Sequence, residues 1–120
     1  MNDTARQTLI EIIRQYGPGL VDEPRRLEGL LKDLCGEYKR EIHTLMDAAR
    51  ERVAQDLLAG ARNSLPPELV AAGLVQRLLQ DLPMSEEMAR WAVESWAAAL
   101  GVEIRLPPAL QPAAGKGRAK

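Results

Sequence analysis

The stretch DEPRRLEGLLKDLCGEYKREIHTL, residues 22–45, decides the expected fold of this chain. Its first half carries four leucines at steps of three and four residues, the spacing that places side chains on one stripe of a helix. These are Leu27, Leu30, Leu31 and Leu34. After Gly36 a second apolar stripe follows, made of Tyr38, Ile42, Leu45 and Ala49. Two amphipathic segments joined so closely predict an antiparallel helical hairpin, on which the other segments would pack.

Outside this hairpin, Gly, Pro and capping residues divide the chain into further helices. Asp3, Asp22 and Ser85 are predicted N-caps, and Gly101 is predicted to end the last helix. Between residues 37 and 61 either a break near Arg52, which we favour, or one long helix fits the pattern. The helices are predicted over about residues 4–16, 23–35, 37–50, 53–61, 67–82 and 86–100. We therefore expect an all-α, compact bundle of five to six short helices over residues 1–101.

Residues 102–120 differ in composition from the bundle and form a predicted tail or linker rich in Pro, Ala, Gly and Lys. Residues 102–106 alternate between apolar and polar side chains, and a single such segment is expected to lie as a strap on the bundle. From about Pro107 the composition offers too little apolar surface to offset the entropy of ordering, so a flexible segment is predicted. It could lead to another domain or be a free end.

Composition and charge narrow the class of protein. The chain has 120 residues, enough for one domain with a single core, and its net charge of −1 argues against a chain that coats nucleic acid or an acidic membrane. Cys35 is the only cysteine, so no internal disulfide can form and a reducing compartment is expected. There is no signal-peptide pattern and no apolar run long enough for a membrane span. We expect a cytoplasmic protein.

The sequence carries no constellation of residues typical of catalysis. His43 and Cys35 are the only histidine and cysteine, too few for a structural zinc site. Cys35 is expected to act as a small hydrophobe and His43 as a helix-surface residue. The carboxylates are dispersed among Arg and Lys, as on a solvated face, and no glycine-rich phosphate loop is present. We expect no enzyme activity, no cofactor and no small-molecule substrate.

Two pairs of residues are candidates for protein interaction. Trp91 and Trp96 are separated by five residues, which puts them roughly 140° apart around a helix. One tryptophan in the core and the other half exposed at an interface is the simplest arrangement, and two core tryptophans are the alternative. Arg25 and Arg26, at the start of the second helix, are the other candidate pair.

Basic residues also raise the possibility of DNA binding. Lys39 and Arg40 open the third helix, but in an antiparallel hairpin they lie at the opposite end from Arg25 and Arg26. Acidic neighbours dilute both clusters, and no recognition helix with exposed Arg, Asn or Gln at its start is visible. Nucleic acid is therefore not the expected partner.

Several short sequence motifs, taken in order, resemble those of a small helical module. That module is found at the ends of bacterial multidomain proteins, beside kinase-like, repeat-scaffold or other effector domains. They are YGP at 16–18, DEPRR at 22–26, LLKDLC at 30–35, REI at 40–42 and ARWAVESW at 89–96. The chain lacks the proline of that pattern near Val53. Helix number and size are also similar to those of death-fold adaptor domains. The resemblance implies an adaptor or regulatory interaction domain without catalytic residues.

Two function classes follow from the sequence. The expected one is a non-catalytic protein–protein interaction module of a bacterial signalling or effector system, binding another protein or domain, with self-association included. The alternative is a small helical DNA-binding regulator.

Overall fold

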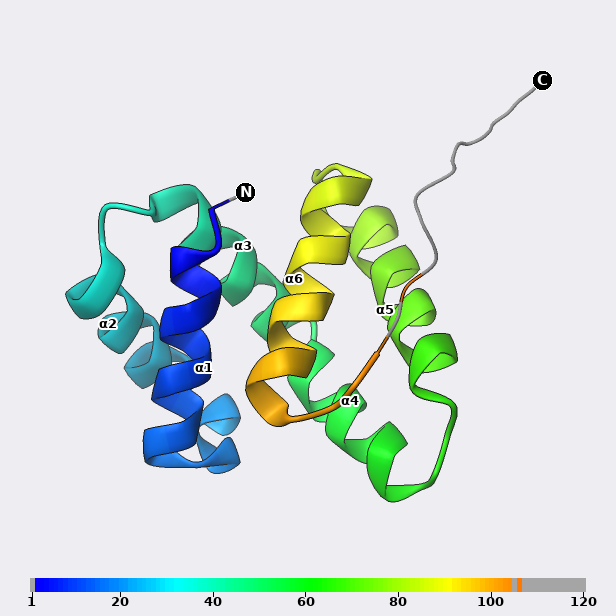
Figure 1. Ribbon diagram of the computed structural model, residues 1–120. Helices are drawn as coiled ribbons and strands as arrows, with labels where there is room; N and C mark the ends of the chain where they lie inside the picture. Colours follow the sequence, from blue (N-terminus) through cyan, green and yellow to red (C-terminus); the bar gives the residue numbers. More distant parts are fainter. Residues whose placement is uncertain (1, 105, 107–120) are drawn as a thin grey trace.

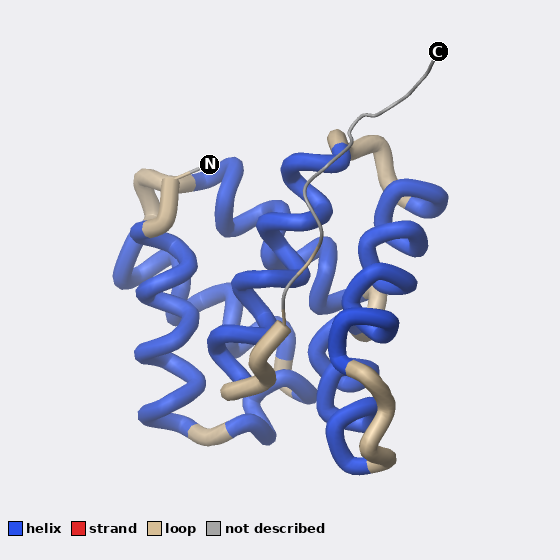
Figure 2. The backbone as a smooth tube through the Cα atoms, turned by 45° about the vertical axis from the view of Figure 1, so that its right-hand side comes forward, coloured by secondary structure: helices blue, strands red, loops and turns tan. Residues whose placement is uncertain are grey.

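The protein is helical throughout the part of the chain that the computed structural model describes, residues 2–104 and 106 (Figures 1 and 2). Six α-helices and one short 3₁₀ helix, η1, follow one another in that part, and no strand lies among its residues. The elements are α1 (Thr4–Tyr16), η1 (Pro18–Asp22), α2 (Pro24–Cys35), α3 (Lys39–Arg50), α4 (Val53–Arg62), α5 (Pro67–Asp81) and α6 (Glu86–Leu100). The predicted all-α bundle is confirmed.

Helix α6 is the centre of the bundle. It packs against α1, α3, α4 and α5, and in Figure 1 it lies between α1 on one side and α5 on the other. Small residues let these helices approach closely, since Ala89, Ala92 and Ala97 are buried on α6. The hairpin of residues 22–45 was expected to hold this central place. That expectation is wrong, because α6 buries side chains on several of its faces whereas α2 buries one stripe.

Helices α2 and α3 form the predicted antiparallel hairpin. Arg50, the last residue of α3, reaches back to Glu28 in the first half of α2, with 3.4 Å between Nη2 and Oε1. The stripe on α2 differs from the prediction in one position: Leu34 is 64% exposed. Helix α2 packs through Leu27, Leu31 and Cys35. These buried residues are four positions apart, so the buried stripe includes Cys35 and leaves Leu34 in solvent.

Of the three predicted N-caps, Ser85 is confirmed and Asp22 is wrong, because Glu23 is the residue at the N-cap of α2. Asp3 stands at the predicted N-cap position of α1, but its side chain makes no capping hydrogen bond. The Ser85 hydroxyl accepts a hydrogen bond from the Met88 N–H at 3.1 Å. The Asp3 carboxylate instead accepts a hydrogen bond from the Trp91 indole, and the Asp22 carboxylate accepts one from the Gln55 amide. Both aspartates therefore hold distant helices together, a use that local sequence does not reveal. Gly101, with a φ of 76°, ends α6 as predicted.

The break between α3 and α4 is confirmed at Arg52. Arg52 adopts a left-handed conformation, with a φ of 66°, and α4 starts at the next residue. A non-glycine residue rarely takes this conformation, so packing must compensate for its cost. Val53 and Ala54, directly after the turn, are fully buried. The turn thus redirects the chain so that α4 reaches α6 and α5.

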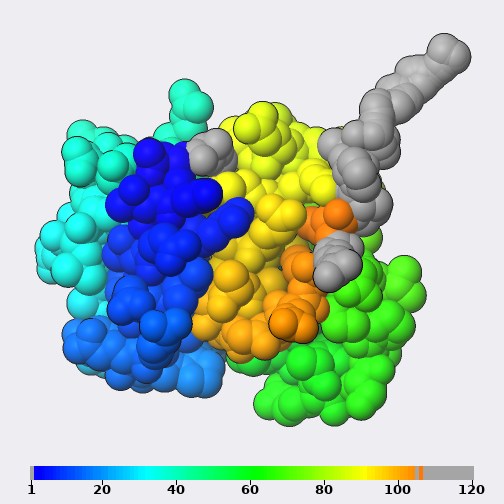
Figure 3. Space-filling model, viewed as in Figure 1, coloured from blue at the N-terminus to red at the C-terminus, as the bar shows by residue number. Residues whose placement is uncertain are grey.

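The predicted strap lies on the bundle. Val102, Ile104 and Leu106 are partly buried against the core, and the Val102 N–H donates a 2.8 Å hydrogen bond to the Ala97 carbonyl. In Figure 3 this segment, coloured orange, lies between α6 in yellow and the green atoms of α5. The predicted flexible segment from Pro107 lies outside the described residues. That residues 1–101 fold on their own stays a prediction.

Two leucines three residues apart on α2 test this packing. Leu31 is fully buried, so replacing it with alanine should cost about 2–5 kcal/mol of unfolding free energy through lost apolar contacts and a residual cavity. Leu34→Ala, at the exposed position, should change stability by no more than about 0.5 kcal/mol. Denaturant unfolding measures both. Equal losses at the two positions would mean that α2 is rotated relative to this arrangement.

Candidate interaction surfaces

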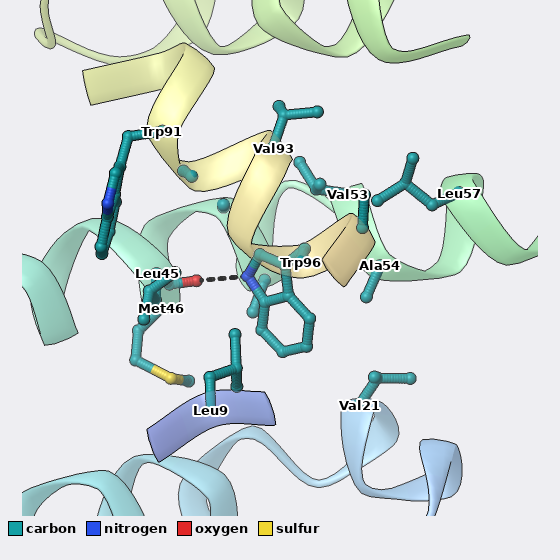
Figure 4. Packing of buried hydrophobic residues seen from close by; sticks show 14 of the residues in the cluster. Leu9, Val21, Leu45, Met46, Val53, Ala54, Leu57, Trp91, Val93 and Trp96 are labelled. Atoms are coloured by element: carbon teal, nitrogen blue, oxygen red, sulfur yellow. Dashed lines mark hydrogen bonds between the residues drawn. The ribbon is translucent and has the colours of Figure 1, made fainter. Parts of the chain in front are cut away.

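Both tryptophans belong to the core. Trp96 is 0% exposed and Trp91 6%, so the expectation that one ring is half exposed is wrong and the alternative is confirmed. Figure 4 shows the two rings leaving α6 in different directions, Trp96 toward Leu45, Leu9 and Val21. The Trp96 indole donates a 3.0 Å hydrogen bond to the Leu45 carbonyl. Because neighbours surround α6, two directions far apart around its axis both lead into protein.

Arg6 of α1 covers the Trp91 side of α6. Its guanidinium carbon lies 5.6 Å from the centre of the Trp91 ring, and its Nε donates a 2.8 Å hydrogen bond to the Ser95 hydroxyl. Arg6 also forms a 3.6 Å ion pair with Glu94, the last member of this cluster. This cluster joins α1 to α6 and was missed by the sequence analysis, since its members are about 90 residues apart in the chain. It leaves Trp91 no open face for a partner.

Arg25 and Arg26 are exposed at the start of α2, as predicted. Arg26 pairs with Glu23 at 3.6 Å and stacks over the Tyr16 ring, 5.1 Å from its centre. Lys39 and Arg40 open α3 at the other end of the antiparallel hairpin. The structure therefore keeps the two basic clusters apart, as the sequence indicated.

The two residues weighed for metal or nucleophilic chemistry take structural positions. The His43 side chain is 76% exposed, and its Nε2 lies 3.7 Å from Asp47. Cys35 is buried, and this burial raises the pKa of its thiol, which works against a reactive thiolate. Within residues 2–104 and 106, no group of three or more His, Cys, Asp or Glu side chains is arranged to hold a metal.

The most exposed apolar surface borders a groove between α4 and α5. Leu65 is 49% exposed and Leu69 69% exposed. They line a groove of about 460 Å³, together with Gly60 and Gly73. At Gly73 a Cβ atom would meet no other atom within 4 Å, so this glycine leaves the groove wall open. This surface was not among the sequence-based predictions, although two leucines signalled it: Leu65 directly before two prolines and Leu69 in the first turn of α5.

A charged cluster closes one end of this groove. Arg77 on α5 forms a 2.6 Å ion pair with Asp56 on α4 and donates a hydrogen bond to the Glu51 carbonyl. Glu51 lies beside Asp81, and the pKa of Glu51 is raised, first by a hydrogen bond between the two carboxyl groups and then by burial and repulsion from Asp81. A nearby like charge disfavours the ionised form of a carboxyl group, which is the direction of this shift.

Comparison with protein-family models, with curated proteins and with solved structures finds no match to this chain. Among residues 2–104 and 106, no helix is both long and apolar enough to span a membrane. What the structure establishes is a compact six-helix all-α domain.

Glu51 gives the domain a testable pH dependence. Its pKa is raised in the folded protein, so the folded state holds a proton that the unfolded state releases as pH rises above the ordinary carboxyl value. Stability from this group is present at acidic pH and is lost as pH rises through the raised pKa. Glu51→Gln, which cannot ionise, should therefore raise the melting temperature at neutral pH, and the gain should vanish in acid.

Thermal unfolding at a series of pH values measures this effect. Glu37→Gln, which removes the same charge from an exposed position, is the control. A gain of the same size in the control would attribute the effect to net charge rather than to the Glu51–Asp81 contact.

Proposed function

We propose that this domain is a non-catalytic protein–protein interaction module, an adaptor or regulatory unit that binds another protein. The observation that carries the proposal is the exposed apolar border of the α4–α5 groove. Four large hydrophobic side chains are strongly exposed in the described part of the chain, and two of them, Leu65 and Leu69, flank this one groove. Clustered apolar side chains beside a groove are typical of partner binding, whereas scattered ones are ordinary.

The position of α5 supports this use. Helix α5 packs against α4 and α6 and lies at the edge of the molecule, so its outer side faces solvent (Figure 1). An amphipathic segment of a partner could lay an apolar side chain over Gly73 and cover Leu69. The resemblance to helical modules of bacterial signalling or effector proteins supports the same class. A reducing, cytoplasmic location fits the single buried Cys35.

The alternative, a helical DNA-binding regulator, has less support. A recognition helix presents exposed side chains to the base edges of the major groove. Here Arg50, at the end of α3, is bonded to Glu28 of α2 and to Asp47 of its own helix. These ion pairs hold α3 against α2. They also neutralise Arg50, which would otherwise be available to bind a DNA phosphate.

Capture of a protein partner tests the proposed function. The immobilised full chain should retain a protein from a lysate of the source cells at a salt concentration that releases it from DNA-cellulose. Leu69→Gln should reduce the retained amount several-fold, because it removes apolar contact area at the groove. Leu34→Gln, at an equally exposed leucine on α2, is the matched control and should retain the partner fully.

The opposite results are also informative. Retention on DNA that is lost with rising salt, without a captured protein, would favour the DNA-binding alternative. Full capture by Leu69→Gln would place the interaction on another face.

Gly73→Ala separates binding from stability. Since the added methyl group meets nothing within 4 Å, the fold should accept it, and replacing a glycine inside a helix should stabilise the domain by about 0.5–1 kcal/mol. The same methyl group narrows the groove, so capture should fall. Gly29→Ala, also inside a helix and also free of neighbours, should stabilise the domain and leave capture unchanged. Thermal unfolding and the capture assay measure the two effects, and a Gly73→Ala variant that captures normally would contradict the groove assignment.

A further inference from the structure

The outer side of α3 carries a basic stripe that neither the core nor the α4–α5 groove uses. At the helical repeat, its members fall within about a third of the helix circumference. They are Lys39, Arg40, His43, Asp47 and Arg50. With His43 neutral, three of the five are cations and one is an anion, on a chain whose net charge is −1. The stripe is therefore a locally positive face of a slightly acidic protein.

The carboxylates of this face are already paired. Asp47 lies 3.4 Å from Arg50 and 3.7 Å from His43, and Glu28 of α2 lies 3.4 Å from both Lys32 and Arg50. Neither Lys39 nor Arg40 has an ion-pair partner among residues 2–104 and 106. The unpaired positive charge of this stripe therefore lies at the start of α3, on Lys39 and Arg40. Glu41, in the same turn, falls on the other side of the helix from the stripe.

A groove of about 440 Å³ runs beside these cations, between α2 and α3. Lys32, Lys39 and His43 stand around it together with Glu28, whose carboxylate is paired with Lys32, and Ile42 forms part of its floor. Gly36 also lines it, at the turn after α2, where the close Lys32 carbonyl oxygen leaves no room for a Cβ atom. A second hollow, of about 270 Å³, adjoins at His43 and brings in Arg40 and Met88. Cations around an apolar floor match a ligand that carries both carboxylates and an apolar side chain.

We propose that this α2–α3 face binds an acidic segment of a partner protein, with carboxylates of the segment on Lys39 and Arg40 and an apolar side chain in the groove above Ile42. The inference goes beyond the proposed function, because α2 and α5 lie on opposite sides of α6 (Figure 1). The domain would then have two separate binding faces, one charged and one apolar, which suits an adaptor that joins two partners.

Charge complementarity favours an acidic protein segment over nucleic acid. Binding to a duplex requires cations spaced along many phosphates, and affinity grows with the number neutralised. Here the two unpaired cations of the stripe lie in one turn of α3, and the stripe's carboxylate, Asp47, lies about two turns further along the helix. A short acidic segment needs only two such cations.

Chemical-shift mapping with a defined probe tests the proposal. The probe is a short peptide of glutamates with one central leucine, added to the isotope-labelled full chain at near-physiological salt. Signals of residues 36–43 should shift, and Lys39→Glu combined with Arg40→Glu should weaken binding by about tenfold or more. Arg25→Glu with Arg26→Glu makes the same charge change at the other end of the hairpin and should leave affinity within about twofold.

Each other outcome overturns the proposal. Absence of shifts, or shifts spread evenly over the surface, would remove the site. An equal loss of peptide affinity in both double variants would mean that binding depends only on the net charge of the protein. A short DNA duplex that binds the same residues more tightly than the peptide would assign the face to nucleic acid, and concentration-dependent dimerisation lost in the Lys39/Arg40 variant would assign it to a second copy. All these variants leave Leu69 and Gly73 intact, so capture at the α4–α5 groove succeeds or fails independently.

Discussion

The burial of Trp96 is the interaction on which the arrangement of helices depends. Its indole ring is fully enclosed, and its N–H reaches the Leu45 carbonyl of α3. A buried tryptophan removes about 200 Å² from water, worth about 5 kcal/mol, provided that its polar N–H finds an acceptor. The hydrogen bond meets that condition and fixes the position of α3 along α6. With α6 held in this way, α1 and α5 can pack on its two sides (Figure 4).

This core has consequences for function. Because both tryptophans are enclosed, and Arg6 covers Trp91, neither can serve as an exposed interface anchor without rearrangement. The chemistry left on the surface divides into two kinds. Exposed leucines border the α4–α5 groove, while Lys39, without an ion-pair partner among the described residues, stands at the α2–α3 groove. An interaction module that uses these surfaces would bind one partner by apolar contact and another by charge.

Much of the local structure could be predicted because its causes are local. The apolar stripes, the Ser85 cap, the Gly101 ending and the turn near Arg52 each depend on a few neighbouring residues. The failures have a common origin as well. Asp3 and Asp22 were predicted as caps, but their carboxylates accept hydrogen bonds from Trp91 and Gln55, which are far away in the chain. Local rules cannot weigh a competing partner that only folding brings near.

By itself, the sequence determined that this chain forms short amphipathic helices, where most of them begin and end, and that its histidine and cysteine are too few for a zinc site. These properties follow from side-chain periodicity and backbone preference. Only the tertiary structure decided that α6, rather than the α2–α3 hairpin, is central, that both tryptophans are buried, and that Leu69 and Lys39 remain in solvent. The physical reason is that a helical stripe specifies which residues can be buried together, whereas exposure depends on which other helices arrive to cover them.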